Sequence, residues 1–214
     1  MARITIIGGT GYAGALIVAE AASRGHEVTS ISRALPDEKI DGVTYVEGSV
    51  TDADIRARAV QDADVAYSAI SPRGDMEGHT RQALADLAGA AQQAGVRLGV
   101  TGGAGSLLVT EGGPRLSDTD DFPDAFKTEA AEMAAVLDDL RASDASLDWF
   151  YVSPAAGFGA FAPGEKTGAF RVGGDVLLAD ADGNSFISGA DFATAVVDEI
   201  EQPAHRRTRF SVAY

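Results

Sequence analysis

The chain has 214 residues, a length that suits one domain, and its 45% hydrophobic and 23% charged residues are ordinary globular usage. A formal net charge of −15 argues against sequence-independent binding to nucleic acid or anionic lipid, because both depend on clustered Lys and Arg. The absence of cysteine excludes disulfides, thiolate metal sites and a cysteine nucleophile, so redox chemistry would need a bound cofactor.

The N-terminal part alternates branched apolar runs with stretches of helical period. Arg3–Ile7 is predicted to be the first strand, followed by a glycine loop at Gly8–Gly14 and a helix that continues to about Arg24. Gly25 is the expected stop of that helix. Three further strands are predicted, with a short Asp-rich helix before the last of them: Glu27–Ser32, Val43–Val46 and Asp64–Ile70.

The C-terminal part repeats the same alternation. Three segments carry apolar residues at helical spacing, namely Leu84, Leu87, Ala88 and Ala91, then Met133, Val136, Leu137 and Leu140, then Ala193, Val196, Val197 and Ile200. The strands expected after them are Val96–Thr101, Leu147–Val152 and Arg209–Val212. This order is typical of an α/β fold with a doubly wound, mostly parallel sheet, the Rossmann fold.

Two irregular stretches interrupt the rhythm, Gly102–Phe126 and Ser153–Ser188, and each follows the carboxyl end of a predicted strand. Ligands bind at that edge of an open α/β sheet, so both stretches are predicted walls of a substrate pocket. We expect a single domain over residues 1–214, in which residues 154–188 contribute to the pocket.

The glycine loop predicts a dinucleotide site because it follows a strand and opens a helix. Gly8 permits a tight exit from the strand, Gly11 lets the backbone approach phosphate oxygens, and Gly14 lets the helix pack closely on the sheet. Free N–H groups and the positive end of the helix dipole would hold the pyrophosphate. The predicted contacts are Gly8, Thr10, Gly11, Tyr12, Ala13 and Gly14.

The residues after the second strand indicate which cofactor is preferred. An acidic residue there accepts hydrogen bonds from a ribose diol, whereas Arg pairs with a 2′-phosphate. Here the residues are Ser32 and Arg33, which favours NADP(H) while leaving NAD(H) possible. The alternative is that Arg33 is an ordinary surface charge.

Five motifs together resemble a known family. They are Gly8–Gly14, Thr101–Leu107, Asp148–Ala156, Pro163–Gly168 and Ile187–Ala193. In these motifs the chain resembles the atypical short-chain dehydrogenase/reductase proteins, in particular a small bacterial group of candidate NADH-flavin reductases related to NmrA-like and biliverdin reductase B-like proteins. The first motif is shared by the whole superfamily, whereas the last three in this order are more specific to the group.

The resemblance implies further cofactor contacts. Those beside the ribose and pyrophosphate would be Ser68, Ala69, Ile70 and Ser71, and those near the nicotinamide and its ribose would be Thr101, Gly102, Gly103, Pro154, Ala155 and Ala156. The adenine would rest near a Gly-Asp-Val sequence, which here reads Gly48-Ser49-Val50. Ser49 and Val50 are therefore predicted adenine contacts, without the family's aspartate.

The chain departs from the superfamily in its acid catalyst. Dehydrogenases of this superfamily usually carry a Tyr four residues before a Lys, and the Lys lowers the Tyr pKa so that the phenol can pass a proton. Lys127 stands at a plausible Lys position, but the residue four places earlier is Pro123. Ordinary alcohol or ketone chemistry is thereby disfavoured.

Reduction of a flavin or similar conjugated acceptor suits the remaining residues, because such an acceptor takes hydride at a ring atom and draws its proton from solvent. In this hypothesis flavin is a substrate and not a bound prosthetic group. Phe158, Phe161 and Phe170 are candidate stacking residues, or else part of a packed lid. The candidate catalytic residues are Ser106, which alternatively caps a turn, and Lys127, which would bond a ribose hydroxyl or is a surface Lys.

No metal site is predicted. His26, His79 and His205 are isolated, and the Asp-rich runs at 118–121 and 180–184 read more simply as turns than as Ca²⁺ loops. The expected partner is a small planar acceptor, with no nucleic acid and no membrane, and the sequence leaves the oligomeric state open. The composition, with neither a signal peptide nor a membrane-spanning apolar run, leads us to expect a cytoplasmic protein.

Two rival functions stay open. One is a redox sensor that binds NADP(H) and transmits its oxidation state to a protein partner without turnover, as the NmrA-like relatives suggest. The other, a sugar-nucleotide epimerase or dehydratase, is disfavoured because the chain is short for that group's substrate domain and lacks the Tyr.

Overall fold

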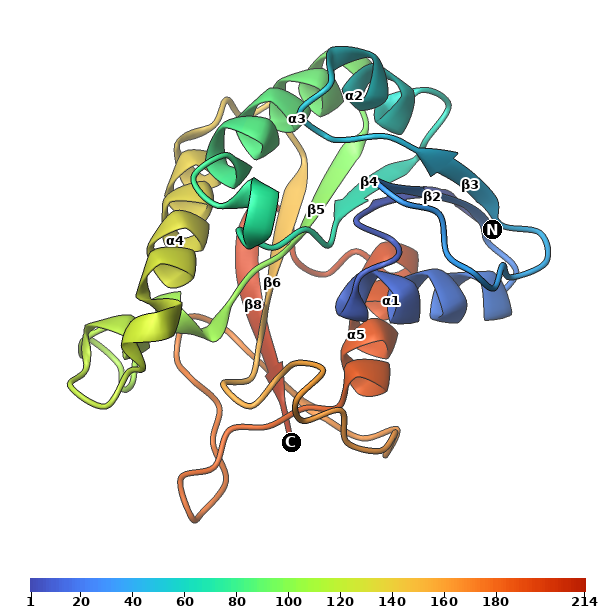
Figure 1. Cartoon of the computed structure of the whole chain (residues 1–214). Helices are drawn as coiled ribbons and strands as arrows, with labels where there is room; N and C mark the ends of the chain where they lie inside the picture. The colour runs from blue at the N-terminus through green and yellow to red at the C-terminus, as the bar shows by residue number, and fades with distance from the viewer.

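The computed structural model describes residues 1–214 as an eight-stranded sheet in the order β3-β2-β1-β4-β5-β6-β8-β7 (Figure 1). Every neighbouring pair is parallel except β7 and β8, which run antiparallel. The strands are β1 (Arg3–Ile7), β2 (Glu27–Ser32), β3 (Thr44–Glu47), β4 (Val65–Ser68), β5 (Arg97–Thr101), β6 (Trp149–Pro154), β7 (Arg171–Gly173) and β8 (Thr208–Ala213). The predicted doubly wound, mostly parallel sheet is confirmed.

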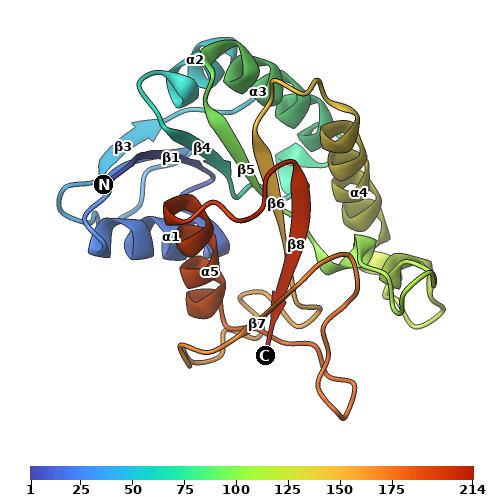
Figure 2. The ribbon, with the colours of Figure 1, turned by 180° about the vertical axis from the view of Figure 1, so that it is seen from behind.

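Helices cover both faces of this sheet. Figures 1 and 2 show α1 and α5 side by side on one face, and α2, α3 and α4 on the other. The helices are α1 (Tyr12–Ser23), α2 (Ala53–Val60), α3 (Thr80–Ala94), α4 (Lys127–Ala142) and α5 (Gly189–Glu201), with short 3-10 turns at Gly74–Met76 (η1), Ala104–Ser106 (η2), Leu116–Asp118 (η3) and Asp124–Phe126 (η4). The strand order reverses between β1 and β4, which is where such sheets open a crevice for a ligand.

The core has two halves, one under each helical layer. Alternate side chains of a strand point to opposite faces, so Phe150 and Val152 join α1 and α5 while Trp149 and Tyr151 join α3 and α4. Ile6 and Ile7 divide between the two halves in the same way. Burial on both faces explains why these strands read as nearly continuous apolar runs in the sequence.

The structure differs from the predicted elements at a few ends. The fourth strand, β4, covers Val65–Ser68 and is shorter than the predicted Asp64–Ile70, although Asp64 and Ala69 still donate backbone hydrogen bonds to Arg3 and Ile7 of β1. Ala88 is only partly buried. The strand β7 was missed because it is short and exposed, with no buried alternation of its own.

The irregular segment before α5 is tied down by one buried carboxylate. Asp191 accepts hydrogen bonds from the backbone N–H groups of Thr167 (2.7 Å) and Gly168 (3.0 Å) and from the hydroxyl of Tyr214 (2.5 Å). Burial alone would raise the pKa of this carboxyl, but these donors outweigh burial and hold the pKa below its usual value. The segment therefore has a fixed place beside α5.

None of the helices combines the length and apolar character that a membrane crossing requires.

Candidate functional site

The glycine loop folds back tightly between β1 and α1. Gly8 has φ +81°, a left-handed conformation that favours glycine, and its N–H donates to the Ile31 carbonyl at 2.8 Å. The Gly11 N–H donates to the Gly8 carbonyl at 3.0 Å. A Cβ on Gly14 would lie 2.0 Å from the Gly8 carbonyl oxygen, so the first turn of α1 sits directly on the loop. The expected need for glycine at Gly8 and Gly14 therefore has a steric basis.

This geometry leaves donors free at the start of α1. The backbone N–H groups of Tyr12, Ala13 and Gly14 have no acceptor within the protein, and the first turn of the helix has no acidic side chain. Unpaired N–H groups at a helix N-terminus, together with the helix dipole, favour an anion. The loop therefore fits the pyrophosphate of a dinucleotide without help from a charged side chain.

The carboxyl end of β2 contributes the next residues. The Thr10 N–H donates to the Ser32 hydroxyl at 3.0 Å, so Ser32 ties the loop to β2 and keeps its own hydroxyl proton available. Arg33 follows with its side chain 54% exposed, and its Nη1 donates to the Asp75 carboxylate at 2.9 Å. Neither residue is acidic, so no carboxylate stands where a ribose diol would usually be bound.

A cleft of about 350 Å³ joins these elements. The predicted residues that line it are Gly8, Thr10, Gly11, Ser32, Arg33, Ser49, Val50, Ala69, Ile70 and Ser71. Gly48, the first residue of the predicted adenine motif, also lines it, and the lining residues that the sequence did not single out are Ile7, Ile31, Ala34, Arg73 and Met76. The cleft thus lies over the strand reversal between β1 and β4 and matches the adenosine and pyrophosphate half of the predicted site.

Arg73 is the main cleft residue that sequence reasoning missed. Its Nε donates to the Glu129 carboxylate of α4 at 2.6 Å, and its guanidinium lies 5.7 Å from the centroid of the Phe126 ring. The sequence feature that could have identified Arg73 is its place two residues after Ser71, a predicted cofactor contact, on the segment that follows β4. The lining of the cleft therefore contains a second cation in addition to Arg33.

The residues predicted to lie near the nicotinamide do not line this cleft. Thr101 is half-buried at the end of β5, and its hydroxyl shares a 2.8 Å hydrogen bond with the buried Tyr67. A Cβ on Gly102 would overlap the Tyr151 ring. Gly103 is half-buried, Ser68, Pro154 and Ala155 are buried, and Ala156 is exposed. Their contacts with a cofactor stay predictions.

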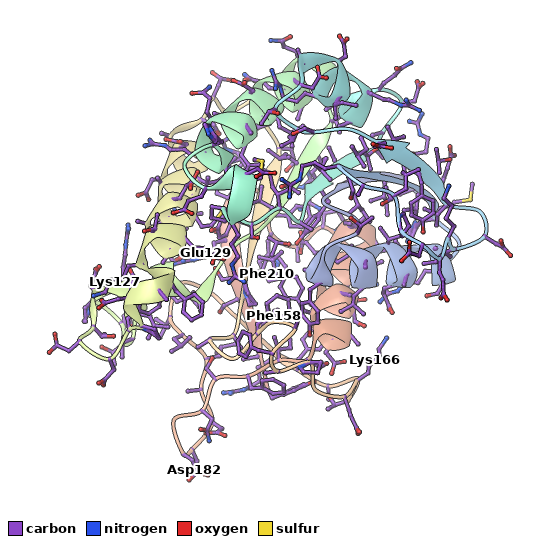
Figure 3. The ribbon with its side chains drawn as sticks, viewed as in Figure 1. Lys127, Glu129, Phe158, Lys166, Asp182 and Phe210 are labelled. Carbon is purple, nitrogen blue, oxygen red and sulfur yellow. The ribbon has the colours of Figure 1, made fainter.

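The two candidate catalytic residues also lie outside the cleft. The buried Ser106 accepts a 2.8 Å hydrogen bond from Arg209, whose guanidinium also binds Asp175, so this hydroxyl belongs to a network under η2. Lys127 pairs with the exposed Asp124 at 2.6 Å. Figure 3 places Lys127 on the outer side of α4, away from Glu129, as expected for residues two apart in a helix. The ribose contact of Lys127 and the acceptor contact of Ser106 stay predictions.

The aromatic candidates differ among themselves. Phe158 packs 4.6 Å from Phe192 and 5.5 Å from Tyr12, measured between ring centroids, and so joins the core near α5 (Figure 3). Phe170 is partly buried against the same core, whereas Phe161 is 71% exposed. Only Phe161 has a freely accessible ring.

No tyrosine takes the place of the missing acid. Pro123 caps the turn before α4, and the phenols of Tyr67 and Tyr151 are fully buried, which raises the pKa of each above its ordinary value. The Tyr12 hydroxyl points at the Pro163 carbonyl, 3.4 Å away. None of the cleft's lining residues is a tyrosine.

The Asp-rich run at 180–184 forms a turn, in which Asp180 accepts from the N–H groups of Asp182 and Asn184. The His26 ring accepts a hydrogen bond from the Ala2 N–H through Nδ1, and its Nε2 contacts the Glu201 carboxylate. His205 pairs with the Glu199 carboxylate at 2.7 Å. Nowhere do three or more His, Asp or Glu side chains gather in a way that could hold a metal ion.

The comparisons with known proteins agree with this geometry. Residues 8–203 match the NAD(P)H-binding family. The uncharacterized protein YwnB of Bacillus subtilis is 38% identical over 212 residues, which cover 98% of this chain and 97% of that protein.

Two solved structures are similar over the whole chain. A candidate epimerase from Bacteroides thetaiotaomicron is 31% identical with a TM-score of 0.89, covering 100% of this chain and 97% of that one. A candidate NADH-flavin reductase from Streptococcus pneumoniae is 33% identical with a TM-score of 0.85, covering 100% of this chain and 99% of that one. Together with the open anion site at α1, these matches show that the chain belongs to the NAD(P)H-binding family, in the atypical short-chain dehydrogenase/reductase group.

Proposed function

We propose that this protein is an NADPH-preferring reductase that passes a hydride to a flavin or a similar conjugated acceptor. The observation that carries the cofactor assignment is the cleft, which is lined by the glycine loop and by Arg33 at the end of β2. The free N–H groups of α1 follow directly after Gly11, the last loop residue in that lining. When bound, a reduced nicotinamide would supply a hydride, which carries two electrons and one proton. The acceptor would take one further proton from solvent.

The choice of acceptor rests on the absence of the superfamily's proton-donating tyrosine. A ketone needs a proton donor at its oxygen during hydride transfer, whereas a conjugated ring system needs orientation more than a dedicated acid. Pro123 stands in place of the superfamily's Tyr, and the buried phenols of Tyr67 and Tyr151 are unsuited to that role. The similarity to a candidate NADH-flavin reductase supports the same acceptor class.

The acceptor would lie at the carboxyl ends of β5 and β6, between the segments 105–126 and 157–170. Phe161 is the one aromatic candidate there with an exposed ring, so we propose that it covers the acceptor. The partly buried Phe158 would support that segment by packing against Phe192. The chain's own contribution is then to hold two planar rings against each other.

The test is direct oxidation of NADPH by the purified protein. NADPH is mixed with FMN, riboflavin or a quinone, and the loss of nicotinamide absorbance is followed against a protein-free control. We expect oxidation above the protein-free rate with at least one of these acceptors. No acceleration with any acceptor would refute the enzyme assignment.

The cofactor preference predicts the behaviour of Arg33→Ala. Loss of a charge-assisted hydrogen bond to the 2′-phosphate should weaken NADPH binding by about 10- to 100-fold, while NADH binding stays unchanged. Fluorescence titration of both nucleotides measures the difference. Arg58→Ala, which removes an exposed arginine of α2, is the matched control and should leave both affinities unchanged. Equal binding of NADH and NADPH by the unaltered protein would contradict the preference.

One observation favours the sensor as the second candidate function. Ser106 and Lys127, the two residues considered for catalysis, are each engaged with another side chain, Arg209 and Asp124 respectively. A sensor would bind NADPH tightly in the titration and fail to oxidise it in the assay. The two measurements together therefore separate the enzyme from the sensor.

A further inference from the structure

Each of the two arginines that line the cleft forms an ion pair with its own carboxylate, and neither carboxylate lines the cleft. Arg33 pairs with Asp75 at 2.9 Å, and Arg73 pairs with Glu129 at 2.6 Å. The two carboxylates differ in exposure, because the Glu129 side chain is 26% exposed whereas the Asp75 side chain is 93% exposed. Asp75 has Arg33 as its only ion-pair partner, and solvent surrounds the rest of it.

The position of Asp75 is set by the fold. It lies in the middle of η1, between Gly74, whose φ of +58° turns the chain, and Met76, which is 5% exposed and lines the cleft. The Thr80 hydroxyl donates to the Met76 carbonyl at 2.9 Å and joins η1 to the start of α3. The anchored backbone therefore holds the carboxylate at the mouth of the cleft.

We propose that Asp75 determines cofactor specificity by competing with the 2′-phosphate for Arg33. This inference rests on the proposed function, because it takes the cleft to be a nicotinamide dinucleotide site. With a free 2′-hydroxyl in the cleft, the pair between Arg33 and Asp75 stays closed. A 2′-phosphate that pairs with both Nη groups of Arg33 would displace Asp75, because the Asp75 carboxylate already occupies Nη1.

The charge balance gives the direction of the effect. A phosphate monoester carries a charge between −1 and −2 at neutral pH, and Asp75 adds a further negative charge beside it against the single positive charge of Arg33. The 2′-phosphate must therefore break an existing ion pair and tolerate a neighbouring anion. Asp75 thus reduces the NADPH preference that Arg33 creates, by weakening NADPH binding and leaving NADH binding unchanged.

The experiment is nucleotide binding to Asp75→Asn, an isosteric change that removes the charge. NADP⁺, NAD⁺ and 2′,5′-ADP are titrated calorimetrically at low and at moderate salt. We expect NADP⁺ and 2′,5′-ADP to bind about three- to tenfold more tightly at low salt, with a smaller gain at higher salt and no change for NAD⁺. Asp182→Asn is the matched control, because it removes the same charge at a distant loop tip (Figure 3) and should change neither affinity.

The Arg33→Ala background separates competition from general repulsion. In that background the gain in NADP⁺ affinity caused by Asp75→Asn should largely disappear, because the Arg33 guanidinium for which Asp75 competes is absent. A gain of the same size without Arg33, or an equal gain for NAD⁺, would overturn the proposal. Because binding is measured without turnover, a protein that binds nucleotide but reduces no acceptor still tests it, whereas a protein that binds no nucleotide refutes both proposals.

Discussion

Replacing Gly14 by alanine should weaken dinucleotide binding by at least tenfold while the sheet stays folded. The new methyl group would lie 2.0 Å from the Gly8 carbonyl oxygen and 2.9 Å from the Gly9 Cα, and these are backbone atoms that cannot rotate away. Relief therefore requires the first turn of α1 to move off the loop, which also displaces the free N–H groups of Tyr12 and Ala13. Such overpacking costs about 1–3 kcal/mol of stability.

A second glycine gives the control for this change. Gly89 lies within α3, and a Cβ there would meet nothing within 4 Å. Gly89→Ala should therefore keep nucleotide affinity and raise the free energy of unfolding by about 0.5–1 kcal/mol, because alanine is the better helix former. Calorimetric titration and urea unfolding of both variants provide the comparison. Unchanged binding by Gly14→Ala would mean that close approach of helix and loop is not what holds the nucleotide.

Arg97→Met should lower the free energy of unfolding by about 3–5 kcal/mol, the largest stability change that we expect from a single side chain. Arg97 opens β5, and its Nη2 donates to Glu199 at 2.6 Å and to the His205 carbonyl at 2.9 Å. Its guanidinium also lies 4.3 Å from the centroid of the Phe150 ring. The Glu199 side chain is 3% exposed, so methionine would leave a buried carboxylate without its main partner.

Urea unfolding measures this loss, and two further variants locate its cause. Arg97→Met combined with Glu199→Leu removes both charges and should recover a large part of the loss. Arg81→Met breaks the exposed pair with Asp139 and should cost far less than Arg97→Met, because solvent screens that pair. Similar losses for Arg81→Met and Arg97→Met would contradict the weight that we give to burial.

The ion pair between Arg97 and Glu199 should also make the free energy of unfolding depend on pH. Burial alone would raise the pKa of Glu199, but hydrogen bonds from Arg97 and His205 outweigh burial and hold the pKa below its ordinary value. The folded protein then binds fewer protons at this site than the unfolded chain, so the stabilisation is present above the unfolded pKa of about 4.3 and is lost as pH falls through the folded pKa. The stability difference between the unaltered protein and Arg97→Met should therefore shrink in that acidic range.

The sequence predicted the elements well where their signals are local. β1 and β2 have the expected bounds, and the three apolar helical faces are buried apart from the partly exposed Ala88. Such signals arise from the period of the chain and from burial on one or both faces, which each segment carries within itself. Gly95, which directly follows α3, and Gly25, two residues beyond the end of α1, both have positive φ and end their helices for the same local reason.

The missed parts of the site depend on contacts between distant segments. Whether Lys127 or Glu129 faces the cleft depends on the rotation of α4 about its axis, which packing on the sheet decides. The partner of Ser106 is Arg209, 103 residues away. The pair between Arg33 and Asp75 joins the end of β2 to a turn after β4, across the cleft mouth. No periodicity in either segment could have predicted these pairings.

The packing of α1 against α5 also bears on how the chain folds. The strands β1 to β5 are connected by short crossovers, of which α1 is the first, and can find each other early. α5 is separated from α1 by most of the chain, so the packing of α5 on α1 should be among the last contacts to form. The glycine loop is held by bonds to the neighbouring β2, so nucleotide added during refolding should be able to act before α5 has docked.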